Sequence, residues 1–154
     1  MSATKLKSFL DSRGARYVTI RHSPAYTAQE VAASAHVTGR DFAKTLVVYV
    51  GGDLAMVVLP ATRRLVIHDL QQMLENAHVR LATEAEFLSH FPDCEVGAMP
   101  PFGNLYDMPV YVASNLGDEP EIAFNAGTHT EVIKMDYKDF ERLVNPTVLD
   151  FVTT

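Results

Sequence analysis

The sequence has 154 residues, 47% of them hydrophobic and 21% charged, with a formal net charge of −6 at pH 7. A chain of this size and composition is typical of one globular domain that buries a core without disulfides or metal, and no apolar run approaches the roughly 20 residues that cross a bilayer. The acidic balance argues against a protein that coats DNA, and the single cysteine, Cys94, cannot form an internal disulfide. We therefore expect one domain over residues 1–154, cytoplasmic, monomeric and without membrane contacts.

Positive charge is concentrated near the N-terminus. Residues 1–50 carry seven Lys and Arg against three Asp and Glu, a balance of +4, so the rest of the chain carries −10. Such an asymmetry can steer a polyanion toward one face, although chance clustering on a solvated surface explains it equally well.

Apolar periodicity, turn residues and capping patterns predict the elements in chain order. A short amphipathic helix should end at Gly14, and Thr27 with Glu30 has the spacing of a capping box that opens a second helix. The pair Gly51-Gly52 should turn a hairpin, and Thr83 repeats the capping-box spacing. Helices are predicted over residues 5–13, 28–35, 69–74, 84–91 and 136–143, and strands over residues 16–21, 41–50, 54–59, 79–82, 108–113, 121–125 and 130–135.

The order of these elements indicates a fold class. Hairpins and helices are interleaved without a regular βαβ rhythm, which predicts an α/β domain of the α+β type. We expect a mixed, largely antiparallel sheet flanked by helices.

Lys44 stands near the start of an apolar strand. Alternation along the strand places it on the same face as Leu46, Val48 and Val50, which makes it a candidate site residue. The alternative is a lysine at a strand end whose stem covers apolar surface while its ammonium group reaches water.

Two further segments have the character of binding loops. The segment from Gly97 to Gly103 holds two prolines between two glycines, so it should be stiff, and an exposed amide near Gly97 can polarise a carbonyl in the manner of an oxyanion hole. The alternative is an ordinary rigid connection between a helix and a strand. The turn from Asn125 to Thr130 presents His129 at the start of a strand, where the imidazole either contacts a substrate or is satisfied by neighbouring backbone.

Taken together, these segments resemble the YbaK and prolyl-tRNA synthetase editing-domain family of aminoacyl-tRNA deacylases, in its free-standing form. The similarity runs from about residue 5 to 144 and depends on the order and spacing of several short motifs. These motifs are His22, Tyr26, Thr27 and Glu30 around the second helix, Ala43-Lys44-Thr45-Leu46 at the strand, the run from Cys94 to Gly103, and Ala126-Gly127-Thr128-His129.

The resemblance implies a function and a set of site residues. It implies a curved editing-domain sheet and a trans-editing hydrolase that deacylates mischarged tRNA, expected to be tRNA-Pro carrying a small non-cognate amino acid, with prolyl-tRNA synthetase as a further partner. The attacking group in the family is the terminal ribose hydroxyl or a water. The implied catalytic residues are Lys44 and Gly97, and the implied substrate-binding residues are His22, Tyr26, Thr27, Thr45, Ala98, Met99, Pro100, Pro101, Phe102, Gly103, Gly127 and His129.

Other chemistries have weaker support in the sequence. No positional signature makes Cys94 a nucleophile, and the six histidines lack the spacing of a zinc site. Because no dinucleotide or phosphate-loop fingerprint is present, we expect no cofactor. Two alternatives to hydrolysis remain, an inactive tRNA- or synthetase-binding module of the same fold, and an enzyme that forms a Schiff base through Lys44.

Overall fold

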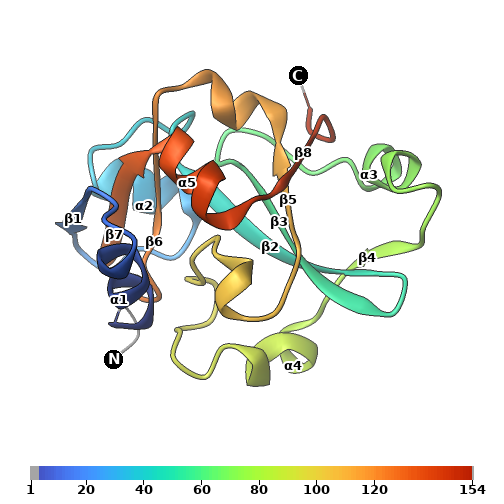
Figure 1. Ribbon diagram of the computed structural model, residues 1–154, viewed down its shortest axis with the longest axis horizontal. Coiled ribbons are helices and arrows are strands. Elements are labelled where there is room, and N and C mark those ends of the chain that lie inside the picture. The colour runs from blue at the N-terminus through green and yellow to red at the C-terminus, as the bar shows by residue number, and fades with distance from the viewer. Residues whose placement is uncertain (1–3, 154) are drawn as a thin grey trace.

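The computed structural model describes residues 4–153, which form five α-helices and eight β-strands (Figure 1). No helix within this range has the length and hydropathy needed to cross a bilayer. The α-helices are α1 (Thr4–Ser12), α2 (Ala28–Ser34), α3 (Ile67–Met73), α4 (Glu84–Phe87) and α5 (Tyr137–Val144). The strands are β1 (Tyr17–Arg21), β2 (Ala43–Val50), β3 (Asp53–Pro60), β4 (Val79–Leu81), β5 (Val110–Ala113), β6 (Glu121–Asn125), β7 (Glu131–Asp136) and β8 (Thr147–Leu149). Short 3-10 helices are η1 (Leu88–His90), η2 (Gly103–Leu105) and η3 (Ser114–Asp118).

The strands form two sheets, of order β1-β7-β6 and β4-β2-β3-β5-β8. All pairs are antiparallel except β3 with β5 and β5 with β8, which confirms a mixed, largely antiparallel α+β domain. In Figure 1 the three-stranded sheet lies at the left with α1 and α2, while the β2–β3 hairpin crosses toward α3 and β4 at the right. The two sheets meet where Phe42 pairs with Ala123 in a parallel bridge and Ala123 N–H donates to the Asp41 carbonyl at 3.0 Å.

Local sequence signals account for most element boundaries. Thr27 accepts a hydrogen bond from the Glu30 amide while the Glu30 carboxylate accepts from the Thr27 amide, so the predicted capping box is confirmed, as is its repeat at Thr83. Gly14 ends α1 with a φ of +66°, a conformation that favours glycine. Asn145 ends α5 in the left-handed region in the same way.

The clearest differences from the prediction concern α3, α4 and β8. Helix α3 begins at Ile67, two residues before the expected start, and α4 has only four residues before the chain tightens into η1. Strand β8 was not predicted, because it is short and mostly exposed and because it follows Pro146, a residue that usually ends regular secondary structure. Its pairing with β5 depends on tertiary contact and leaves no periodic pattern in the sequence.

The core falls into three clusters that follow strand alternation. Val47 points into the main cluster between the sheets, and the neighbouring Val48 points into a second cluster with Leu59 on the opposite face of β2. A third cluster lies under α2 and includes Val31 and Phe42. Helix α2 thus covers the junction at which the two sheets meet.

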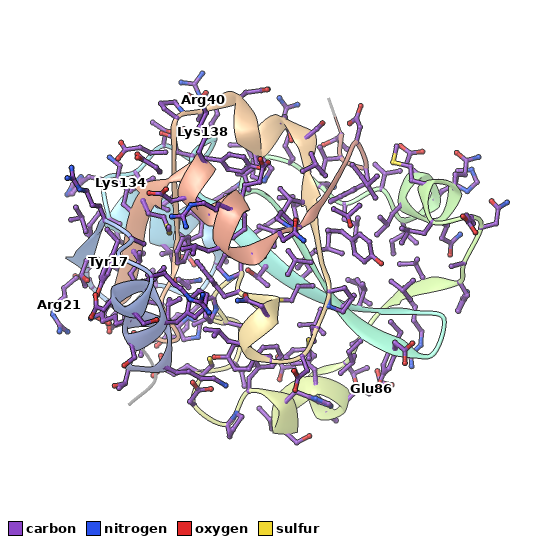
Figure 2. All side chains as sticks on the ribbon, in the orientation of Figure 1. Tyr17, Arg21, Arg40, Glu86, Lys134 and Lys138 are labelled. Atoms are coloured by element: carbon purple, nitrogen blue, oxygen red, sulfur yellow. The ribbon has the colours of Figure 1, made fainter. Side chains whose placement is uncertain are left out.

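Much of the N-terminal positive charge is paired. The Glu131 carboxylate, 5% exposed, lies 2.8 Å from the Lys7 ammonium and 3.7 Å from the Arg21 guanidinium. Arg40 lies 3.2 Å from Glu119. Figure 2 shows Arg21 directed outward from β1, while Arg40 lies at the upper border of the molecule. The charge excess of residues 1–50 is therefore partly neutralised by acidic residues from the second half of the chain.

Candidate active site

The junction of the sheets positions Lys44. The residue pairs with Leu59 across the β2–β3 hairpin, and alternation from Phe42 directs its side chain to the α2 side of the sheet. The start of β2 lies beside β6, because Phe42 and Ala123 form an isolated parallel bridge, and β6 ends two residues later at Asn125. Lys44 therefore lies near the end of β6, after which the His129 turn begins.

Hydrogen bonds hold the Gly97 loop against this turn. The Glu95 amide donates to the Gly127 carbonyl at 2.8 Å, and the Gly127 amide donates to the Ala98 carbonyl at 2.9 Å. The Glu95 carboxylate accepts from the His129 amide at 2.7 Å. The two segments, thirty residues apart in sequence, form one rigid corner.

The His129 ring is fixed within this corner. Its Nε2 lies 2.7 Å from the Val96 carbonyl, and because a carbonyl only accepts, Nε2 carries the proton. Nδ1 is then an acceptor, and it is buried without a partner among the described residues. The Tyr26 ring lies 4.8 Å from the imidazole, centroid to centroid, and Tyr26 is 70% exposed. The corner thus ends in an exposed aromatic ring beside a buried, unsatisfied nitrogen.

His22 repeats this arrangement on a neighbouring segment. Its amide donates to the Thr130 carbonyl at 2.9 Å, and its Nδ1 lies 2.7 Å from the Ser23 carbonyl, so Nδ1 carries the proton. The second nitrogen, Nε2, is buried without a partner in the described part of the chain, as is Oδ1 of Asn125. Buried acceptors of this kind are normally paired, so their gathering here is compatible with a ligand that donates hydrogen bonds.

Gly97 has a backbone conformation that favours glycine. Its φ is +84°, a conformation that side-chain-bearing residues rarely adopt, and a Cβ built there would lie 3.6 Å from Cε1 of His129. Gly97 is exposed, and within residues 4–153 its N–H donates to no backbone or side-chain acceptor. The loop therefore holds a free amide donor next to the His129 ring, as an oxyanion hole requires.

Not all residues implied by the resemblance lie at this corner. Phe102 is fully buried and contacts the rings of Phe9, Phe124 and Phe140, and Met99 lies in the same core cluster. Pro100, Pro101 and Gly103 are also buried. Thr45 pairs with the core residue Val58, and the Thr27 hydroxyl caps α2. The corner unites His22, Tyr26, Gly97, Ala98, Gly127 and His129, with Lys44 at its edge.

Two hollows of the described surface lie away from this corner. One of about 660 Å³ is lined by Tyr137, Gly117 and four carboxylates against one lysine, and one of about 700 Å³ lies beside Tyr49 and Tyr106. A hollow with an excess of negative charge repels a polyanion, so its size does not make it the better site for a nucleic acid.

Cys94 lies close to the loop but does not have the properties of a nucleophile. Its Sγ is 3.3 Å from the Tyr106 hydroxyl and 3.7 Å from the Asp93 carboxylate. Burial, aided by Asp93, raises the pKa of the Cys94 thiol to about 11, so the thiolate is scarce at neutral pH. The thiol is a packing group behind the corner.

Comparison with known proteins identifies the family. A model of the aminoacyl-tRNA editing domain matches residues 22–143. The chain belongs to the aminoacyl-tRNA editing domain family. The match to the editing domain spans Lys44, the Gly97 loop and the His129 turn, and it confirms the resemblance to the YbaK family.

Solved structures share the fold of this editing domain. A candidate trans-editing enzyme for prolyl tRNA synthetase superposes with a TM-score of 0.84 at 22% identity, over 99% of this chain and 98% of that chain. Hypothetical protein APE2540 gives a TM-score of 0.85 at 23% identity, over 97% and 99% of the two chains. A scaffold protein used for epitope grafting gives 0.82 at 20% identity, over 99% and 97%. A comparison with curated protein sequences finds no significant match.

Proposed function

We propose that the protein is a trans-acting aminoacyl-tRNA deacylase, a single editing domain that hydrolyses the ester between a non-cognate amino acid and the 3′ end of tRNA. The observation that carries the proposal is the free, exposed Gly97 amide, held at positive φ beside His129 in a corner that the family match includes. A fixed donor stabilises a developing oxyanion without reorganising during the reaction.

The roles of the other residues follow from this placement. Lys44 holds an oxygen of the substrate by charge, and the attacking group is a water or the terminal ribose hydroxyl, since the pKa of Cys94 disfavours a thiolate. The buried acceptors of His22 and His129 receive hydrogen bonds from the hydroxyl or ammonium groups of the aminoacylated ribose. The exposed ring of Tyr26 offers a surface on which a base can stack.

The proposed substrate is tRNA-Pro that carries an amino acid smaller than proline. Support comes from the structural neighbour described as a candidate trans-editing enzyme for prolyl tRNA synthetase, and from the rigidity of the corner, which favours discrimination by exclusion. Excluding a bulkier side chain is effective because one methylene of additional apolar contact contributes only about 1–3 kcal/mol. Prolyl-tRNA synthetase is the expected partner, and a monomer in the cytoplasm is the expected form.

A panel of mischarged tRNAs tests the proposal. The protein should release alanine from alanyl-tRNA-Pro and leave prolyl-tRNA-Pro intact, as followed by loss of the radiolabelled aminoacyl ester. Binding of these tRNAs without loss of any ester would instead favour an inactive module of the same fold. Equal hydrolysis of the prolyl and alanyl esters would contradict selection by exclusion.

A further inference from the structure

Lys44 has a cationic neighbour, Arg64, on the segment that follows β3. After β3 ends at Pro60, the chain runs past the start of β2, where the Ala61 amide donates to the Phe42 carbonyl at 2.8 Å. Lys44 pairs with Leu59 at the end of the hairpin, so this segment leaves the sheet beside Lys44. It continues to Arg63 and Arg64, and the charge of Arg64 is close enough to act on Lys44. Two cations from different segments thus lie at one edge of the corner.

The backbone of Arg64 is held in place by the C-terminal segment. Its amide donates to the Thr153 hydroxyl at 3.2 Å, and its carbonyl accepts from the Thr153 amide at 3.1 Å. Leu65 then pairs with Val152 in an antiparallel bridge. The position of Arg64 is therefore built into the fold, although the residue is exposed.

The two consecutive arginines have different surroundings. The Arg63 guanidinium donates to the Thr153 carbonyl at 3.1 Å and lines a small hollow with Asp118 and Glu119. Arg64 makes no side-chain hydrogen bond or ion pair within residues 4–153, and its charge is the one that acts on Lys44. Arg63 is committed to the protein, whereas Arg64 is available to a ligand.

The pair of Lys44 and Arg64 has no acidic partner in the described part of the chain, unlike Lys7, Arg21 and Arg40. Burial, and second the positive charge of Arg64, lower the pKa of the Lys44 ammonium below its ordinary value. Two cations held together without a counterion repel each other, and an anion bound between them would remove that repulsion. The missing partner is therefore an anion that arrives with the ligand.

We propose that Arg64 is a second cation of the substrate site and that, with Lys44, it binds a backbone phosphate at the acceptor end of tRNA. This rests on the proposed function, since the phosphate must adjoin the ester that the Gly97 loop receives. Arginine suits the task because its guanidinium can hold two phosphate oxygens at once. Lys44 then neutralises the same phosphate from the other side.

The salt dependence of binding to tRNA-Pro that carries no amino acid tests this assignment, and it does so whether or not the protein is a deacylase. Arg64→Gln should lower the slope of log K against log salt by about one, because one phosphate contact is lost, whereas Arg64→Lys should retain it. Arg63→Gln is the matched control, with the same change of charge at the adjacent position, and should leave the slope near the wild-type value. Equal slopes for Arg64→Gln and Arg63→Gln would overturn the proposal whether or not the protein is active.

A pair of small esters locates the phosphate. Wild-type protein should hydrolyse the 5′-phosphate of 2′(3′)-O-alanyl-adenosine more efficiently than the phosphate-free ester, by on the order of tenfold in kcat/KM for one charge-assisted contact. Arg64→Gln should reduce this preference several-fold, with the remainder due to Lys44, whereas Arg63→Gln should keep it in full. A preference that is undiminished in Arg64→Gln would contradict the assignment. Failure of wild-type protein to hydrolyse any alanyl ester would instead contradict the deacylase function, and the salt slopes would still decide the role of Arg64.

Discussion

Replacing Lys44 with alanine is expected to reduce deacylation of mischarged tRNA by on the order of 10²–10³-fold, the range for losing one charged or oxyanion-stabilising contact. Lys44 places a positive charge near the end of β6, where the His129 turn begins. By holding the phosphate beside the reacting ester, Lys44 positions that ester against the Gly97 amide, so its loss should lower kcat through misplacement of the ester and also raise KM. Steady-state kinetics on alanyl-tRNA-Pro measure this effect.

The fold should survive the Lys44→Ala substitution. Lys44 is only half-buried and makes no ion pair within residues 4–153, so its removal leaves no buried charge without a partner. Circular dichroism and a thermal melt should match the wild-type protein. Lys138→Ala is the matched control, because Lys138 is exposed on α5 beside the acidic hollow, and its activity should be near normal. A folded Lys44→Ala protein with near-normal activity would remove Lys44 from the mechanism.

Gly103→Ala is expected to destabilise the protein by about 3 kcal/mol, the upper part of the usual range for overpacking a core. A Cβ at Gly103 would overlap the Met108 carbonyl oxygen and lie 2.6 Å from Cγ2 of Val110. The backbone oxygen cannot rotate away as a flexible side chain would, so the loop or β5 must shift. Urea denaturation, followed by circular dichroism, measures the change in the free energy of unfolding.

Gly52→Ala provides the comparison for this substitution. No atom outside the neighbouring residues lies within 4 Å of a Cβ built at Gly52, and its φ is not in the left-handed region. The same methyl group should therefore change stability by less than about 1 kcal/mol there. Equal stability of the two variants would mean that Gly103 is not a packing position, which would return it to the group of substrate contacts that the resemblance implies.

The sequence predicted those parts of the fold that depend on local chemistry. The capping boxes at Thr27 and Thr83 and the glycine turn of the hairpin each involve residues within a few positions of one another, and all are present. The corner itself was predicted only through the resemblance, because bonds such as Glu95 to His129 join segments that no local pattern connects.

The proposed role of Arg64 and the unpartnered oxygen of Asn125 were not foreseen from the sequence, because both depend on tertiary placement. Arg64 lies in no recognised motif, Asn125 only opens the predicted turn, and the segments that carry them meet the start of β2 only in the fold. Conversely, Phe102 and Gly103 belong to the Gly97 motif and were expected to bind substrate, but they pack in the core. A stiff loop that crosses the protein must bury part of its length. Sequence spacing cannot separate the exposed end of such a loop from its buried end.

The corner of Lys44, Gly97 and His129 is proposed to receive the aminoacylated end of tRNA. A titration of ¹⁵N-labelled protein with 3′-alanylamino-3′-deoxyadenosine, an amide analogue that is not hydrolysed, tests it most directly by NMR. The amide resonances of Gly97, Gly127 and His129 should shift together as the analogue binds, and those of Lys44 and Tyr26 should also shift. Shifts confined to the hollow at Gly117 and Tyr137, with the Gly97 and His129 amides unmoved at saturation, would contradict it.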